Sequence, residues 1–137
     1  MDAKDLLEWY AGFVKHKDIF AKKIEKIEQG KDCMLVHYKD QCEEAYPVPA
    51  LENGNIPELK KEKRVTIITA NTKKNLDLLV ANWQKLARYP ELTIYFVNPA
   101  STKEIKWVIR PNLHDKVADT DTLKSGLKSL FLTVDPA

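Results

Sequence analysis

Glycine, cysteine and histidine are scarce in this sequence, and each scarcity excludes a class of function. The 137 residues include 4 glycines, 2 cysteines and 3 histidines. Four scattered glycines do not form the glycine-rich loop that cradles phosphates in common nucleotide-binding enzymes, and the GxSxG motif of many hydrolases is absent as well. The common nucleotide-binding and covalent enzymes therefore lack their signatures in this chain.

The cysteines and histidines also lack the spacing of known sites. Cys33 and Cys42 are too few for a disulfide framework and have no CxxC spacing, so we expect two reduced, partly buried thiols, although the strands predicted around them would allow them to be cross-strand neighbours. His16, His37 and His114 show no metal-ligand pattern such as HExxH. We therefore predict no metal site and no cofactor.

Long apolar runs are missing too. No window approaches the roughly 18 to 20 consecutive apolar residues that span a bilayer. The first ten residues, MDAKDLLEWY, alternate charged and apolar side chains where a signal peptide would be continuously apolar. We expect a cytoplasmic protein with no membrane partner.

Charge is plentiful and unevenly distributed. The chain has 22 basic and 20 acidic residues, a net charge of +2. Residues 60–110 hold eleven of the basic residues and four of the acidic ones, so this stretch carries +7 and the remainder −5. A basic face raises the local concentration of polyanions, whereas a solvated surface of mixed sign is the alternative.

The N-terminal part of the chain predicts helix. Residues 3–29 place apolar side chains three or four apart, which favours one long amphipathic helix ended by Gly30. Lys17 occupies a position where this stripe would need an apolar residue, and Asp18 could cap a second segment. A break into two helices near residue 17 is therefore the alternative.

From Lys31 onward the apolar spacing changes to two. Residues 33–38 and 42–48 predict a β-hairpin, and residues 50–63 predict a polar loop. The second half predicts strands at 64–70, 92–98 and 104–110, a helix at 73–89, a helical turn at 113–118 and a final helix capped within 119–121. A right-handed crossover makes the strands at 64–70 and 92–98 parallel.

These elements give the order α-β-β-β-α-β-β-α. We predict one α/β domain over residues 1–137, with a mixed sheet of about five strands and flanking helices. Trp9, Trp83 and Trp107 fall on the apolar phase of their elements, so we expect them in the core rather than stacked on bases.

This order of elements, over residues 3–98, resembles the core of the restriction-endonuclease-like nucleases, the PD-(D/E)XK superfamily. The resemblance implies an Asp on the second strand and a Glu-x-Lys on the third, which bind Mg²⁺ and position the attacking water. The third predicted strand here, 64–70, has neither a carboxylate nor a lysine. Glu58-Leu59-Lys60 and Glu104-Ile105-Lys106 match the triplet but lie elsewhere and lack an Asp partner. We therefore predict no catalytic residues.

One feature breaks a rule of helix composition. Lys73 and Lys74 fall in the first turn of a predicted helix, where the macrodipole favours acids. An anion or a neighbouring acid would offset them, and with exposed backbone amides they could hold a phosphate. The residues predicted to bind nucleic acid or phosphate are Lys60, Lys61, Lys63, Arg64, Asn71, Thr72, Lys73 and Lys74.

We therefore expect a binding domain rather than an enzyme, one that interacts with nucleic acid through the basic stretch at 60–110. The first alternative is a protein-interaction or regulatory domain that uses its long N-terminal helix. The second is a divergent metal-dependent nuclease.

Overall fold

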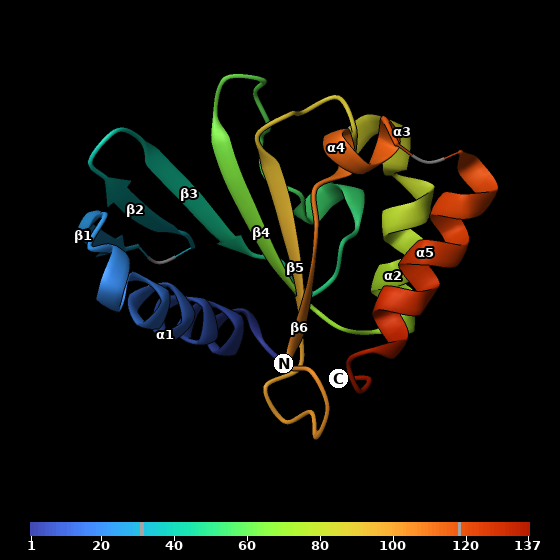
Figure 1. Cartoon of the computed structure of the whole chain (residues 1–137), viewed down its shortest axis with the longest axis horizontal. Coiled ribbons are helices and arrows are strands. Elements are labelled where there is room, and N and C mark those ends of the chain that lie inside the picture. The colour runs from blue at the N-terminus through green and yellow to red at the C-terminus, as the bar shows by residue number, and fades with distance from the viewer. Residues whose placement is uncertain (31, 118) are drawn as a thin grey trace.

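The computed structural model describes residues 1–30, 32–117 and 119–137, and the sequence predictions at Lys31 and Ala118 fall outside these ranges. The described residues form a mixed α/β fold with one six-stranded sheet and five flanking α-helices (Figure 1). The elements are α1 (Ala3–Ala21), β1 (Ile24–Gln29), β2 (Met34–Tyr38), β3 (Cys42–Pro47), β4 (Arg64–Ala70), α2 (Lys73–Ala81), α3 (Trp83–Leu86), β5 (Leu92–Val97), β6 (Lys106–Ile109), α4 (Pro111–Asp115) and α5 (Thr120–Leu132). The predicted fold class is confirmed, with six strands where about five were expected.

The strands lie side by side in the order in which they occur in the chain, β1-β2-β3-β4-β5-β6. The pairs β1–β2, β2–β3 and β5–β6 are antiparallel, whereas β3–β4 and β4–β5 are parallel. The predicted parallel pairing of 64–70 with 92–98 and the antiparallel strand after it are both confirmed. Each strand therefore pairs with the strands that precede and follow it in the sequence.

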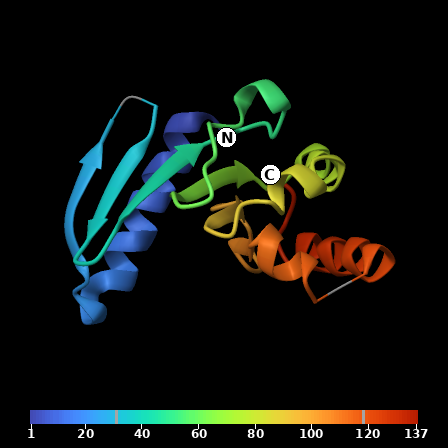
Figure 2. The same ribbon diagram turned by 90° about the horizontal axis from the view of Figure 1, so that it is seen from above.

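Helices cover both sides of the sheet, and Figure 2 shows α1 on the side opposite to α2 and α5. On the α1 side, Leu6, Tyr10 and Val14 pack against Val36 and Ile68 of the strands. The larger core lies on the other side, where the predicted apolar stripes of α2, α3 and α5 meet β4, β5 and β6. Trp83 and Trp107 are buried in this core as predicted, whereas Trp9 is only half-buried.

The prediction of helix over 3–29 is wrong beyond Ala21, because residues 24–29 form strand β1. Lys22 adopts a left-handed conformation with φ 50 and ends α1. A β-bulge between Ile24 and Lys26 shifts the register of β1, so Ile24 and Ile27 both pack on the α1 side although they are three residues apart. The bulge thus gives a strand the apolar spacing of a helix.

Other predictions differ in detail. Gly30 does not end a helix: it follows β1, and its amide donates to Cys33 O at 2.8 Å. The predicted helix at 73–89 is divided into α2 and α3 at Asn82, but its buried phase is the expected one. Cys42 pairs with His37 while Cys33 precedes β2, so the two thiols do not face each other, and Cys42 is exposed.

Candidate functional site

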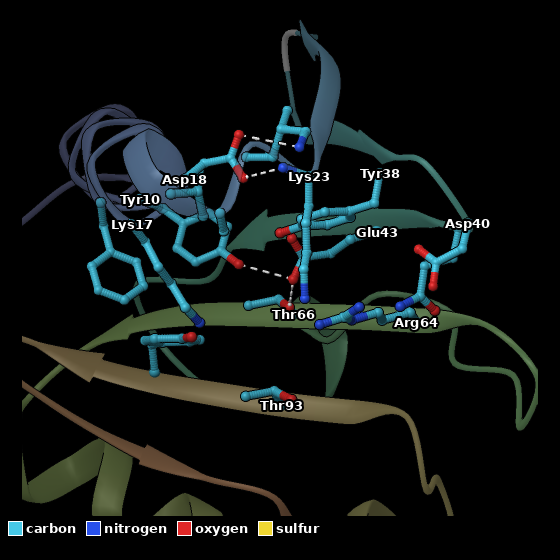
Figure 3. Close-up of a pocket in the computed structure, with 16 residues that line it drawn as sticks. Tyr10, Lys17, Asp18, Lys23, Tyr38, Asp40, Glu43, Arg64, Thr66 and Thr93 are labelled. Atoms are coloured by element: carbon cyan, nitrogen blue, oxygen red, sulfur yellow. Dashed lines mark hydrogen bonds between the residues drawn. The ribbon is translucent and has the colours of Figure 1, made fainter.

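A cavity of about 340 Å³ lies between the C-terminal half of α1 and the sheet (Figure 3). Its walls come from α1 and from β2, β3, β4 and β5. Cationic, aromatic and carboxyl side chains line it, together with hydroxyl, amide and aliphatic ones. Its lining includes Tyr10, Phe13, Lys17, Asp18, Lys23, Tyr38, Glu43, Arg64, Thr66 and Tyr95.

Glu43 is the buried acid of this cavity, with only 3% of its surface exposed. Strand alternation turns its side chain toward α1, between Val36 of β2 and Arg64 of β4. The hydroxyl groups of Tyr10 and Thr66 donate to the same oxygen, Oε2, at 2.8 Å and 2.5 Å. The other oxygen, Oε1, is buried and accepts no hydrogen bond from the described residues.

Tyrosines surround this carboxyl group and stay neutral. Burial, followed by the charge of Glu43, raises the pKa of Tyr38 to about 12 and holds the pKa of Tyr10 far above its usual value. The same two causes raise the pKa of Tyr95. At neutral pH the phenol groups are therefore hydrogen-bond donors rather than anions.

Three cations reach the cavity from different elements. Asp18 accepts hydrogen bonds from the backbone amides of Lys23 and Ile24 at 2.7 Å and 3.1 Å, which fixes the turn after α1 and brings Lys23 to the rim. Lys17 lies over the Phe13 ring at 5.9 Å. Arg64 lies over the Tyr38 ring at 5.3 Å. Figure 3 shows Lys17, Lys23 and Arg64 extending toward the same region.

Within the described ranges, none of these three cations forms a salt bridge. Their positive charge is therefore not cancelled by a direct carboxylate contact. Cations placed over aromatic rings are held by the ring quadrupole and keep donor groups free for an anion.

An aromatic surface continues from the cavity along α1. The Trp9 and Phe13 rings stack with centroids 5.1 Å apart, and Tyr95 meets Phe13 edge-on at 5.6 Å. All three side chains are half-buried. Lys106 of β6 lies over the Phe13 ring at 5.3 Å, so two lysines contact this ring.

The eight residues predicted from sequence fall at opposite ends of β4. Lys60, Lys61, Lys63 and Arg64 precede or begin the strand, whereas Asn71, Thr72, Lys73 and Lys74 follow its last residue. Seven strand residues separate the two groups by about 20 Å. The eight side chains are therefore not one cluster.

At the start of β4, only Arg64 belongs to the cavity. Lys63 pairs with Glu44 at 2.6 Å. Lys60 and Lys61 are exposed and border the same end of the strand. This group therefore contributes Arg64 to the cavity, and Lys60 and Lys61 remain exposed near it.

At the other end of β4, each side chain has a partner within the protein. Lys73 pairs with Asp77 and Lys74 with Glu52, at 2.5 Å and 2.9 Å, so neighbouring acids offset the two lysines. Thr72 caps α2 by accepting from the Asn75 amide. Asn71 is fully buried, donates to backbone carbonyls of the C-terminal segment and accepts from Trp107 Nε1.

Sequence reasoning did not single out Glu43, Lys23, Tyr10 or Tyr38 as site residues. The signal for Lys17 was present, because it interrupts the apolar stripe of α1. Glu43 also carried a signal, since it shares the inward phase of β3 with Ala45. A charged residue at an inward strand position is unusual enough to mark a site.

In the part of the chain that the structure describes, no group of three or more His, Cys, Asp and Glu side chains is placed to hold a metal ion. No helix formed by these residues has the length and apolarity to cross a membrane. Comparison of the sequence with family models, and of the chain with curated proteins and with solved structures, finds no match.

Proposed function

We propose that this protein is a non-catalytic domain that binds single-stranded nucleic acid in the cavity between α1 and the sheet. The observation that carries the proposal is the convergence of Lys17, Lys23 and Arg64 beside half-buried aromatic rings. Proteins that bind single strands combine cations for the phosphates with aromatic rings on which bases stack. A cytoplasmic location belongs to the same proposal.

The arrangement suits a single strand better than a duplex. Bases of a single strand are free to leave their stack and enter a cavity, whereas those of a duplex are paired. The aromatic surface formed by Trp9, Phe13 and Tyr95 extends away from the cavity along α1, with Lys106 beside it. A strand could therefore place one base in the cavity and its neighbours on this surface.

The proposal replaces the sequence-based set of eight contacts by a smaller one. Arg64, Lys60 and Lys61 stay in it, joined by Lys17, Lys23 and Lys106. Lys73 and Lys74 leave it because acidic side chains already pair with them. Asn71 and Thr72 leave it because their side chains serve the fold.

The experiment is fluorescence polarisation of a labelled 12-nucleotide single strand at several salt concentrations. If four to six of these cations contact phosphates, the log–log slope should be about −3 to −4. Changing Lys17 and Arg64 together to Ala should weaken binding and flatten the slope by about 1.4. The matched control is the Lys73→Ala/Lys74→Ala double variant, which removes the same charge from the other end of β4 and should bind like the parent.

Two outcomes contradict the proposal. One is a flat curve from folded protein at roughly 50 mM salt, where the polyelectrolyte contribution is strong. The other is equal loss of binding in the two double variants, since that would mean that only net charge matters. Recovery of the oligonucleotide uncut after incubation with Mg²⁺ or Mn²⁺ is the expected result, and specific cleavage would favour the divergent-nuclease alternative instead.

A protein-interaction domain is the second candidate, favoured by the end of α1. Ile19 and Phe20 are 55% and 94% exposed there. Large apolar side chains exposed together are a feature of contact surfaces. This candidate predicts no nucleic-acid binding, so the same titration separates the two.

A further inference from the structure

We propose that Glu43 reads the base that enters the cavity, and that it selects bases with an exocyclic amino group, namely adenine, cytosine and guanine, over thymine and uracil. This inference rests on the proposed function and concerns specificity alone. The observation behind it is the buried, unpaired oxygen Oε1 of Glu43, a residue that lines the cavity described above (Figure 3).

The two carboxyl oxygens of Glu43 differ in the number of hydrogen bonds that they accept within the protein. Oε2 takes two hydroxyl donors, from Tyr10 and Thr66, which fix the plane of the carboxyl group. Oε1 takes none from the described residues, although it is shielded from solvent. Buried polar atoms in folded proteins nearly always have a partner, so an oxygen held in place without one is suited to a donor brought by a ligand.

The nearest cation does not supply that donor. Arg64 is beside Glu43 in the register of β3 and β4, yet its guanidinium lies over Tyr38 and makes no salt bridge with a described carboxylate. Tyr38 and Arg64 are half-buried. Both line the cavity with Glu43, and in this proposal they shift to let a base reach Oε1.

The chemistry of the base edge decides the selectivity. A carboxylate only accepts hydrogen bonds, and it accepts readily from amino groups of bases. Adenine, cytosine and guanine offer such an amino group. Thymine and uracil present a single ring N–H that lies between two carbonyl oxygens. A carboxylate repels these carbonyl oxygens, because both carry negative charge. The cavity volume of about 340 Å³ falls in the range of small-ligand sites and suits one base between aromatic side chains.

The test measures 12-nucleotide oligo(dA), oligo(dC) and oligo(dT) against the parent protein and against Glu43→Gln. The variant keeps the shape of the side chain, and its amide oxygen can still accept from Tyr10 and Thr66. Because hydrogen bonds to charged groups are among the stronger ones, the parent should bind oligo(dA) and oligo(dC) at least about tenfold more tightly than oligo(dT). Glu43→Gln should bind all three to within about threefold.

A second measurement needs no variant and so does not depend on Glu43→Gln being folded. An oligomer of deoxynebularine, which is deoxyadenosine without its amino group, should bind the parent protein about tenfold more weakly than oligo(dA). It retains the purine ring and the phosphates, and therefore controls for stacking and charge.

The possible results distinguish a failure of the role proposed for Glu43 from a failure of the proposed nucleic-acid binding. Equal binding of oligo(dA), oligo(dT) and the nebularine oligomer would overturn the role of Glu43 and leave nucleic-acid binding intact. A preference that persists in folded Glu43→Gln would overturn it too, since another group would then read the base. Absence of binding to any oligomer would instead remove the proposed function itself.

Discussion

Asn71 provides a sharp test of whether the end of β4 is structural or a phosphate site. The side chain is 0% exposed. Its Oδ1 accepts from Trp107 Nε1 at 2.7 Å, and its Nδ2 donates to the carbonyls of Val134, Phe131 and Asp135 at 3.0, 3.3 and 3.4 Å. One amide thus joins β4, β6 and the segment after α5.

The magnitude follows from the groups that Asn71→Ala leaves without partners. The indole N–H of Trp107 and the carbonyl of Val134 would both stay buried, and each unpaired buried group costs about 1 to 3 kcal/mol. We expect a loss of about 3 to 4 kcal/mol in the free energy of unfolding, a large fraction of the roughly 5 to 15 kcal/mol typical of a domain. Urea denaturation followed by tryptophan fluorescence measures it.

Asn71→Asp and Asn55→Ala complete this experiment. The carboxylate introduced by Asn71→Asp could still accept from Trp107, but its second oxygen would face three carbonyl oxygens, so the loss at neutral pH should be at least as large as for Asn71→Ala. The pKa of that carboxyl would be raised in the fold, and part of the stability should return as the pH falls. Asn55→Ala removes one exposed hydrogen bond, to Ala50 O, and should cost under about 1 kcal/mol. A loss below about 1 kcal/mol for Asn71→Ala would refute the reasoning.

Two further predictions concern the two cores. Trp83 is 5% exposed and donates to Asp115 at 2.8 Å, so Trp83→Ala should lower the free energy of unfolding by about 3 to 5 kcal/mol; an unchanged melting temperature would mean that its packing is misjudged. The pKa of Tyr10 is raised by burial and by Glu43, so the unfolded chain loses that proton near pH 10 while the folded chain keeps it. Stability should therefore fall by about 1.4 kcal/mol from this residue between about pH 9 and pH 11, and Tyr10→Phe should remove that part of the slope; an identical pH profile for the two proteins would contradict it.

The second half of the fold could be predicted because its local patterns agree with its tertiary contacts. The strand at 64–70 is nearly all buried, the stripe of α2 and α3 faces it, and residues 92–97 form a second largely buried strand. The break at Asn82 was not predictable from the stripe, because the buried phase continues through it from Leu79 to Trp83. Each of these elements contributes to the same core.

The first half could be predicted only in part, because periodicity reports spacing and not the cause of the spacing. Ile24 and Ile27 continue the helical spacing of α1, but a bulge in β1 produces the same spacing. The left-handed residue Lys22 is not a glycine, so nothing in its type indicated that a helix ended there. The two hydrogen bonds that the Asp18 carboxylate accepts from the following amides stabilise the turn.

The site could be predicted least of all, since it depends on which elements become neighbours. Arg64 was included among the predicted residues on charge alone, and it does line the cavity. Lys73 and Lys74 were included for their charge and their place in the first turn of a helix, but Asp77 and Glu52 lie beside them. Glu43 accepts a hydrogen bond from Tyr10, which is 33 residues away in the sequence. Neither composition nor local spacing can predict a contact between such distant residues.

The bulge in β1 has a consequence for how copies of this protein behave in a crowded solution. β1 is one of the two outer strands of the sheet, and its free edge offers backbone donors and acceptors to a strand of another copy. The irregular backbone between Ile24 and Lys26, together with Glu25 and Lys26 in solvent, makes that edge a poor template for a regular ladder. Deleting Glu25 would leave Ile24 opposite Tyr38 and Lys26 opposite His37 without an extra residue between them, giving a regular edge on which aggregates could grow.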